Sequence, residues 1–502
     1  MDLFNNLVFG FSVALTWQNL WYCFIGVFLG TLIGVLPGIG PLATIAMLLP
    51  ITFNVPPVAA LIMLAGIYYG AQYGGSTTAI LVNLPGETSA VVTCMDGYQM
   101  ARQGRAGPAL AIAAIGSFFA GTVCTLIIAL FGPPLAEVAL KFGAPEYFSL
   151  MLMGLVAAAV LAGDNMTKSL AMVVMGLLLG IVGTDVNSGM ARFSFGIPEL
   201  TDGLGFIVIA VGVFAMGEII ANLGDPEERV VFTNKVTGLM PTKKDLKDSF
   251  WPIVRGTGIG AFLGVLPGTG PAIASFSSYM LEKKLAKDPS RFGKGAIEGV
   301  AGPESANNAD AQCKFIPTLT LGIPASAVMA LMLGALTIQG IAPGPQVMTQ
   351  KPELFWGLVA SMWIGNAMLV ILNLPLIGLW VSLLKVPYRL LFPAIMAFSC
   401  IGIYSVNNSP FEVYMAAIFG IIGLVWMKLE MPPAPMLLGF VLGPLMEENL
   451  RRALLISRGD PTIFFTRPIS LGMLLVAIFL LIIIVLPFIR KKREEVLKEE
   501  TL

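Results

Sequence analysis

Hydrophobic residues form long blocks along this chain, and short polar stretches separate them. Apolar segments of about 17 to 25 residues recur, which is the length that crosses a bilayer as a helix. Residues 109–131 and 471–489 are two examples. The pattern predicts an all-α polytopic membrane protein with about 11 to 12 crossings.

One broken apolar segment occurs twice. The octapeptide Gly34-Val35-Leu36-Pro37-Gly38-Ile39-Gly40-Pro41 returns at residues 264–271, where Thr269 replaces Ile39 and every other residue is identical. Proline and glycine interrupt a helix, and the backbone groups that they free must find partners. In lipid such a break survives only where it lines a cavity or is buried in protein. A duplicated, broken helix in a membrane protein therefore indicates a transport site.

A second pair of interruptions follows the octapeptides. Residues 74–78 and 83–89 contain Gly-Gly-Ser-Thr-Thr and Asn-Leu-Pro-Gly-Glu-Thr-Ser, and residues 302–310 and 318–326 occupy the corresponding region of the second half. Leu84-Pro85 and Ile323-Pro324 take matching places. We expect residues 74–95 to form a re-entrant segment, and each half to contain two broken segments.

Charged loops indicate that the halves are inverted repeats. The turn at residues 54–57 has no basic residue, whereas its counterpart at 283–294 is strongly basic. The next pair of equivalent loops shows the reverse charge pattern. The loop of the first half contains Arg102 and Arg105, whereas its counterpart at 341–352 contains only Lys351. Basic loops prefer the cytoplasm, so matching loops are expected on opposite sides.

This plan divides the chain into four parts. They are a first repeat (1–230), a cytoplasmic connector (231–250), a second repeat (251–468), and a final helix with a basic cytoplasmic tail (469–502). The expected crossings of the first half are 58–73, 108–132, 147–162, 169–184 and 205–222, and the expected hairpins are 20–51 and 251–281. One loop then disagrees with the preference of basic residues for the cytoplasm, because it places Arg451, Arg452 and Arg458 outside. Their positive charge is partly offset by Glu447, Glu448 and Asp460.

Composition narrows the class of protein. With 56% hydrophobic and 12% charged residues, and a mean hydropathy of +0.83, the chain cannot cover a soluble globule with polar surface. Its net charge is zero, so nothing favours nucleic acid as a partner. It has no histidine, and its five cysteines include no C-x-x-C pair, so we expect neither a metal framework nor a cofactor.

The four interruptions predict a site for an anion and a cation together. Helix N-termini attract carboxylates, and unwound carbonyls coordinate Na⁺, the expected coupling ion. The expected substrate-binding residues are Gly38, Gly40, Pro41, Gly86, Thr88, Ser89, Gly268, Gly270, Pro271, Ala325 and Ser326. The expected cation-binding residues are Ser76, Thr77, Thr78, Asn83, Asn307, Asn308, Asp310, Thr318 and Thr320.

Several of these features also have a plain structural interpretation. A single L-P-G-x-G-P motif can be a packing kink, and Glu87 or Asp310 can lie at a loop tip in water. Glu304 and Lys314 can pair with each other or with lipid headgroups. Glu218 and Glu298 are typical of charges at helix ends.

At its two motif pairs the chain closely resembles the large membrane subunit of the tripartite tricarboxylate transporter family. The resemblance rests on the two G-V-L-P-G-x-G-P copies, on residues 74–78, and on the segment from Gly302 to Pro324. It implies a multi-pass transporter of the bacterial inner membrane. It also implies two partners, a small four-helix membrane subunit and a periplasmic solute-binding protein, and uptake generally driven by Na⁺.

The first hypothesis is therefore a cation-coupled importer of citrate-like tri- or dicarboxylates, and not an enzyme. A gated anion channel is the alternative, because it can share the repeat. A membrane-embedded enzyme, such as a lipid-group transferase, is less favoured, since the sequence has no Asp-rich cluster and no histidine.

Overall fold

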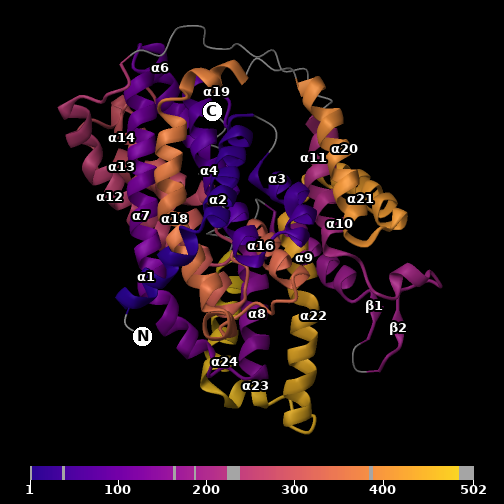
Figure 1. Ribbon diagram of the computed structural model, residues 1–502. Helices are drawn as coiled ribbons and strands as arrows, with labels where there is room; N and C mark the ends of the chain where they lie inside the picture. The colour runs from indigo at the N-terminus through magenta and orange to yellow at the C-terminus, as the bar shows by residue number, and fades with distance from the viewer. Residues whose placement is uncertain are drawn as a thin grey trace. The chain divides into compact units, whose positions relative to one another are not determined.

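The fold, taken from a computed structural model, is almost entirely helical (Figure 1). The structure describes residues 3–36, 40–161, 165–185, 188–222, 238–383 and 388–485. The chain forms two compact units. The larger unit comprises Met1–Ala139 and Gly205–Lys428, and the smaller comprises Leu140–Leu204 and Leu429–Leu502.

The larger unit contains both octapeptides and both second interruptions. Its first elements are α1 (Leu3–Ala14), α2 (Trp17–Val35), α3 (Pro41–Leu48), η1 (Leu49–Asn54), α4 (Pro57–Val82), η2 (Thr88–Ala90), α5 (Val91–Thr93), η3 (Cys94–Tyr98), α6 (Gln99–Arg102), α7 (Ala106–Ala139), α10 (Phe206–Ala210), η5 (Val211–Met216) and α11 (Gly217–Asn222). The later elements are α12 (Lys243–Val265), α13 (Pro271–Leu285), η6 (Pro289–Arg291), α14 (Glu298–Cys313), α15 (Phe315–Leu321), α16 (Ala327–Ile338), α17 (Gln346–Gln350), α18 (Pro352–Asn373), α19 (Ile377–Leu383), α20 (Tyr388–Asn407) and α21 (Pro410–Lys428).

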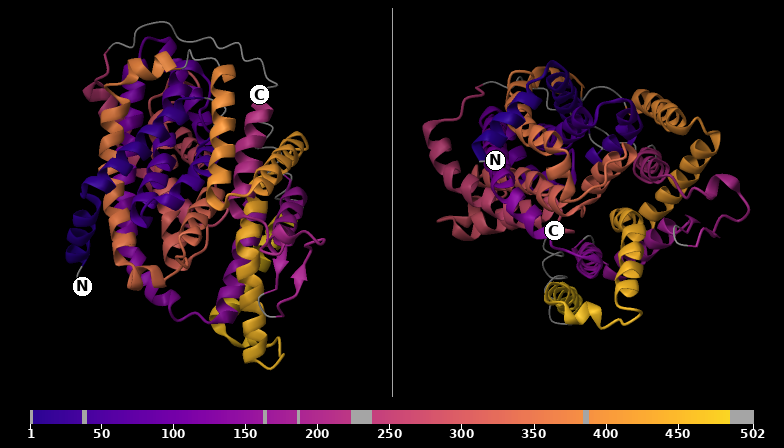
Figure 2. Two further views of the ribbon diagram at one scale, coloured as in Figure 1. Left: turned by 45° about the vertical axis from the view of Figure 1, so that its right-hand side comes forward. Right: turned by 60° about the horizontal axis from the view of Figure 1, so that its bottom comes forward.

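The smaller unit is built from α8 (Ala144–Leu161), α9 (Met166–Gly180), β1 (Gly183–Thr184), β2 (Ala191–Arg192), η4 (Pro198–Leu200), α22 (Pro433–Ile456), α23 (Ile463–Thr466) and α24 (Pro468–Val485). Figure 2 shows β1 and β2 as a short antiparallel ribbon, in which Gly183 pairs with Arg192. Helices α9 and α22 touch through their backbones, since a Cβ added at Gly176 would lie 2.0 Å from the carbonyl oxygen of Met436.

The arginines that violate the expected topology are largely paired within the smaller unit. Arg451 bonds to Glu447 (2.6 Å) and to Asp185 (3.1 Å), and Arg452 bonds to Glu448 (2.5 Å). Asp460, which was expected to offset these charges, instead accepts from the backbone N–H of Thr462 (2.9 Å). Ion pairing reduces the exposed positive charge of this segment.

Four helices of the described residues are long and apolar enough to cross a membrane: α2, α7, α18 and α21. Shorter apolar helices include α1, α8, α9, α16 and α24. The chain is thus built for a multi-pass arrangement, and the number of crossings stays a prediction. Among these helices, α7 and α18 pack side by side in the larger unit (Figure 1).

Two helix pairs, one after the other in sequence, pack through glycines in the same register. Added Cβ atoms at Gly26, Gly30 and Gly34 of α2 would lie 2.3, 2.5 and 2.3 Å from the carbonyl oxygens of Met63, Ile67 and Ala71 of α4. At Gly256, Gly260 and Gly264 of α12 they would lie 2.2, 2.1 and 2.5 Å from those of Gly302, Ala306 and Asp310 of α14. Glycine permits this backbone contact because it has no side chain. Each half therefore contains a helix pair packed through glycines in this way, and the repeat and its inversion stay predictions.

Some expected boundaries were wrong. Residues 74–78 lie inside α4, which is continuous from Pro57 to Val82, so the interruption begins only at Asn83. Residues 302–310 likewise lie inside α14, which accommodates Pro303. The segment expected at 108–132 is longer, because α7 continues through Pro133 and Pro134 to Ala139.

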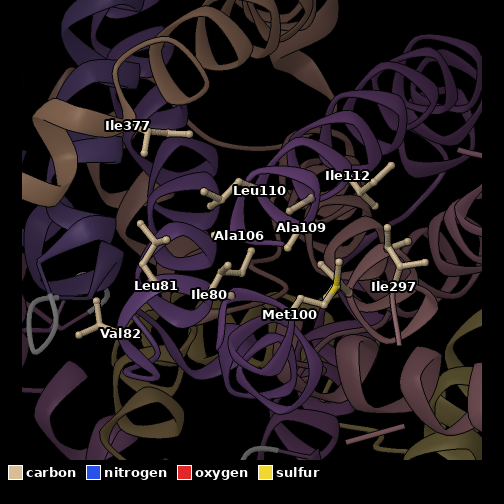
Figure 3. Close-up of a cluster of buried hydrophobic side chains, with 14 of the residues drawn as sticks. Ile80, Leu81, Val82, Met100, Ala106, Ala109, Leu110, Ile112, Ile297 and Ile377 are labelled. Atoms are coloured by element: carbon tan, nitrogen blue, oxygen red, sulfur yellow. The ribbon is translucent and has the colours of Figure 1, made fainter. Parts of the chain in front are cut away.

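A cluster of buried apolar side chains packs several helices of the larger unit against one another. Figure 3 shows Ile80 and Leu81 of α4, Met100 of α6 and Leu110 of α7 within this buried group, which also includes Ile297. Between helices in a bilayer, such side chains stabilise the fold through close van der Waals packing. The cluster holds α4 and α7 firmly beside the start of α14.

Candidate functional site

Helices α4 and α14 are buried along almost their whole length. Every residue of α4 from Ala59 to Val82 is buried, and so is every residue of α14 from Gly299 to Cys313. Polar side chains on these helices therefore lie in the protein interior. Buried polar groups need partners, which makes their contacts informative.

The first interruption of each half ends at a helix with a glycine cap. Gly40 is the N-cap of α3 and Gly270 is the N-cap of α13, and Pro41 and Pro271 occupy the first helical positions. Neither cap makes a side-chain hydrogen bond. Few N–H groups of the first turns are free, because Pro41 and Pro271 have none and the N–H of Ile273 donates to the carbonyl oxygen of Gly270 (3.0 Å). The dipole at such a helix start still favours negative charge. Pro37 and Gly38 lie outside the described residues.

The second interruptions share a backbone geometry. Helix α4 ends at Asn83 and α15 ends at Gly322, and both residues are left-handed, with φ of 60° and 72°. Glu87 and Ser326 then begin the next helical segments in almost the same extended conformation. Both helices end where the sequence predicted an interruption.

Within each half the two interruptions meet. In the second half the N–H of Gly268, whose φ is 82°, donates to the carbonyl oxygen of Ala325 (3.0 Å). In the first half a Cβ added at Gly86 would lie 2.0 Å from the carbonyl oxygen of Gly34 and 2.6 Å from Cα of Gly75. Glycine is thus required at position 86 because the backbone of Gly34 lies too close for a side chain. It is favoured at position 268 because the φ angle there is positive.

The interruptions of the two halves also come together inside the larger unit. Helix α13, which follows the second octapeptide, packs against η2 and α5 of the first half. Helix α3, which follows the first octapeptide, packs against α16 of the second half. The larger unit therefore assembles all four interruptions around α4 and α14.

A fully buried carboxyl group lies at the contact between these helices. Glu304 of α14 is 0% exposed, and it accepts hydrogen bonds from the hydroxyls of Ser76 on α4 and Thr93 on α5. The expectation that Glu304 pairs with Lys314 or with a headgroup is wrong. The carboxyl is held by neutral donors, and among the described residues it has no cationic partner.

Lys314 pairs with Asp310 instead. Both side chains are 0% exposed, and the ammonium donates to Asp310 Oδ2 across one turn of α14. Asp310 is therefore not at a loop tip in water. Removing one partner of such a pair typically costs about 3–5 kcal/mol, because the other charge is left buried alone.

Many polar atoms along this part of α14 make no hydrogen bond to the described residues. They are both side-chain polar atoms of Asn307 and of Gln312, Asn308 Oδ1 and Asp310 Oδ1. Asn308 Nδ2 does donate, to Ser117 Oγ of α7 (2.7 Å) and to the carbonyl oxygen of Glu304 (3.0 Å). Orphaned polar atoms at this density indicate a place for a ligand or ion.

The second interruption of the first half carries another acidic group. Ser89 is buried, and its hydroxyl contacts both the Glu87 carboxylate and Gln72 Oε1 of α4. Glu87 is partly buried and lies against Gly75. Thr88 and Asn83 are exposed, so the structure does not bring them into this group.

The threonines of the predicted cation set bond mainly to backbone. Thr318 donates to the carbonyl oxygen of Lys314 (2.8 Å), Thr320 to Ile316 (2.6 Å), and Thr78 to Val35 (3.0 Å). Thr77 makes only a long contact to Tyr73 (3.4 Å). Their hydroxyl protons are donated to backbone carbonyl oxygens, and their own oxygens keep lone pairs as acceptors.

A small, partly open pocket borders this centre. Its polar lining consists of Tyr73, Ser76 and Thr77 of α4, Ser117 of α7 and Asn373 of α18. Ser76 and Ser117 connect the pocket wall to Glu304 and Asn308, respectively. The pocket offers neutral hydroxyl and amide groups beside the buried carboxyl.

Two acidic residues interpreted as helix-end charges behave differently. The carboxyl group of Glu218 hydrogen-bonds to the backbone of Gly40, so it lies at the first interruption. Glu298 pairs with Arg291 (2.5 Å) and matches the expectation. Sequence reasoning also missed Gln72, Thr93 and Ser117, whose only signal was polarity within apolar segments.

Metal-binding side chains are not grouped in the part of the chain that the structure describes. No cluster of three or more His, Cys, Asp and Glu residues there could hold a metal ion. All five cysteines are free thiols. The chemistry of the centre is that of carboxyl, amide and hydroxyl groups with one lysine.

Comparison with known proteins identifies the family. A protein of Agrobacterium vitis, described as an uncharacterized 52.8 kDa protein in the TAR-I ttuC' 3' region, is 61% identical over 500 residues and both chains are fully covered. Another from that organism, described as an uncharacterized protein in the TAR-II ttuC' 3' region, is 61% identical over 241 residues, which are 100% of that protein and 48% of this chain. No solved structure matches. Residues 20–438 match the tripartite tricarboxylate transporter TctA family, and the chain therefore belongs to that family, as the large membrane component of a tripartite tricarboxylate transporter.

Proposed function

We propose that this protein is a secondary importer that carries citrate-like tri- or dicarboxylates into a bacterial cell, coupled to Na⁺. Family membership makes it a transporter component and not an enzyme. The observation that carries the proposal is the buried centre on α14, where the fully buried Glu304 and Asp310 lie within the unit that contains all four helix interruptions.

The cation is proposed to bind at the oxygen atoms of this centre. Na⁺ that leaves water needs several oxygen ligands, and a buried carboxylate supplies the compensating charge. Glu304 offers that charge, since Asp310 is paired with Lys314, and the unpartnered side-chain oxygens of Asn307, Asn308, Asp310 and Gln312 offer further ligands. Transport is then coupled to Na⁺, because these atoms lack hydrogen-bond partners when the centre is empty and gain a partner when Na⁺ is bound.

The carboxylate substrate is proposed to bind at the glycine-capped ends of α3 and α13. The dipoles of these helices favour negative charge, and glycine lets a ligand approach the backbone closely. Two such ends, one from each half, suit a substrate with more than one carboxylate. The contacts of α13 with η2 and of α3 with α16 support this arrangement.

Transport is proposed to proceed by alternating access in an inverted repeat. The helix pairs α2–α4 and α12–α14, which pack in the same register, support a repeat. As a member of a three-component system the chain works with other components. We propose that these are a small four-helix membrane subunit and a periplasmic solute-binding protein, and that the complex lies in the inner membrane.

Reconstitution tests the proposal. The chain and its two partners are placed in proteoliposomes, and counterflow and net uptake of labelled citrate and succinate are measured while Na⁺ and pH are varied independently. We expect an inward Na⁺ gradient to drive accumulation above equilibrium. Equilibration without accumulation would instead favour the gated anion channel, and accumulation that follows pH alone would contradict Na⁺ coupling.

A further inference from the structure

We infer that Lys314 is a cationic ligand for one substrate carboxylate, and that Asp310 holds this ammonium in place when the substrate is absent. The inference rests on the proposed import of carboxylates and assigns a specificity-determining residue to it.

The argument begins with the face of α14 that carries the pair. Asn307, Asp310 and Lys314 follow one another at intervals of three and four residues, so they share one face of the helix. All three are 0% exposed. One helix face therefore presents an amide, a carboxylate and an ammonium to the protein interior.

This face is incompletely satisfied. An ammonium has three N–H donors, and among the described residues the partner of Lys314 Nζ is Asp310 Oδ2. Asp310 Oδ1 and both polar atoms of Asn307 have no partner there. Charges taken out of water are tolerated when their remaining bonds are made, so this set is built to receive a further polar group. The unused donors of Lys314 and Asn307 match the oxygens of a carboxylate.

The pair lies beside the second octapeptide. A Cβ added at Gly264, the first residue of that octapeptide, would lie 2.5 Å from the carbonyl oxygen of Asp310. Helix α13, which begins just after the octapeptide, also packs on α14. A substrate with two or three carboxylates can thus place one at the start of α13 and another at Lys314.

The first half shows that packing alone does not require an ion pair here. Ala71 faces Gly34 as Asp310 faces Gly264, and four residues later Gly75 stands where the second half has Lys314. The same helix contact is therefore made in the first half by two small, uncharged residues. The charges in the second half need another explanation, which substrate binding supplies.

The test compares variants of the full complex in proteoliposomes. Asp310→Asn combined with Lys314→Gln removes both charges and keeps the side-chain sizes, so that no lone charge is buried. Lys314→Arg keeps the positive charge and changes its geometry. The exposed pair Lys284→Gln with Asp288→Asn removes the same charges elsewhere and serves as the control.

We expect the Asp310/Lys314 double variant to insert like the control and to raise the KM for citrate by about tenfold or more, with a smaller effect on kcat. We also expect it to lose much of the preference for citrate over a monocarboxylate such as propionate. Lys314→Arg should raise the KM as well, because the ammonium position is lost.

A double variant that inserts and keeps the wild-type KM would overturn the inference, since the pair would then be structural. If the double variant fails to insert, Lys314→Arg decides: an unchanged KM overturns the inference, and a raised KM supports it. Failure of the proposed function is a separate result, because the wild-type complex would then accumulate no carboxylate.

Discussion

The hydroxyl of Ser76 on α4 donates to the carboxyl of Glu304 on α14, and both residues are buried. The contact joins two helices that are buried along almost their whole length. It also places the carboxyl beside the pocket that Ser76 lines. A carboxyl held by hydroxyls alone has no cationic partner in the protein, so a bound cation can pair with it, whereas a carboxyl paired with lysine already has one.

Glu304→Gln is therefore expected to reduce Na⁺-driven citrate uptake by about tenfold or more while leaving insertion intact. Glutamine preserves an acceptor oxygen for a hydroxyl but removes the charge. The measurement is the initial rate of labelled citrate uptake against Na⁺ concentration. The control is Glu137→Gln, an exposed carboxyl of α7. An unchanged Na⁺ dependence in the Glu304 variant would exclude this residue from coupling.

Gly86→Ala is expected to destabilise the protein strongly. The added methyl group would lie 2.0 Å from the Gly34 carbonyl oxygen and 2.6 Å from Gly75 Cα, and rigid backbone cannot move aside cheaply. We expect a loss of about 2 kcal/mol or more in stability. Thermal unfolding of the purified protein in detergent measures it. The matched control, Gly258→Ala in α12, has nothing within 4 Å of the new Cβ and should be neutral or slightly stabilising. Equal melting temperatures for the two variants would contradict the close contact.

Asp96→Asn is expected to loosen the basic loop between α13 and α14. The buried carboxylate of Asp96 accepts from Tyr279 Oη (2.9 Å) and from the backbone N–H groups of Gly293 (3.1 Å), Gly295 (2.7 Å) and Ala296 (2.7 Å). An amide cannot accept all of these, so the loop should open more often. Limited trypsin digestion after Lys294 should become several-fold faster than in the wild type.

Asp288→Asn is the control for that experiment, because Asp288 bonds only to Ser290 within the loop's described contacts. If trypsin cleaved the Asp96→Asn and Asp288→Asn variants at the same rate, Asp96 would not restrain the loop.

Acid is expected to weaken the contact between Asp245 and Arg105. Burial raises the pKa of Asp245, but hydrogen bonds from Thr242 and Arg105 outweigh it and hold the pKa below its usual value. The stabilisation is therefore present above the unfolded pKa of about 3.9 and is lost as the pH falls through the lower folded value. The Arg105 side chain is 39% exposed, so the effect is modest.

Melting temperatures of the wild type and Asp245→Asn from pH 3 to pH 7 check this expectation. The difference between them should be constant above about pH 5 and shrink below about pH 4. Asp202→Asn, at an exposed site, should show no such difference. A gap that widens in acid would reverse the assigned sign.

Much of the architecture could be read from local chemistry. Proline and glycine at the octapeptides, and the Leu84-Pro85 and Ile323-Pro324 steps, correctly located the four interruptions, because these residues act on the backbone directly. The extent of each helix was harder. Gly74-Gly75 and Gly302-Pro303 look like breaks in sequence, yet α4 and α14 continue through them because tertiary packing overrides local propensity.

The partners of charged residues were harder still. Asp310 and Lys314 are spaced for a helical pair, but that spacing was informative only once α14 was known to be continuous. The contacts of Glu304 with Ser76 and Thr93 join segments that are distant in sequence. Such long-range contacts leave no local signal in a single chain.

The glycine contacts of α2 with α4 and of α12 with α14 have a mechanical consequence. Because backbone meets backbone along each pair, neither helix can slide past its neighbour without steric collision. Each helix pair is consequently expected to move as a rigid body during the transport cycle. We therefore expect bending to be concentrated at the short joints 83–87, 266–270 and 322–326, where the described helices are interrupted.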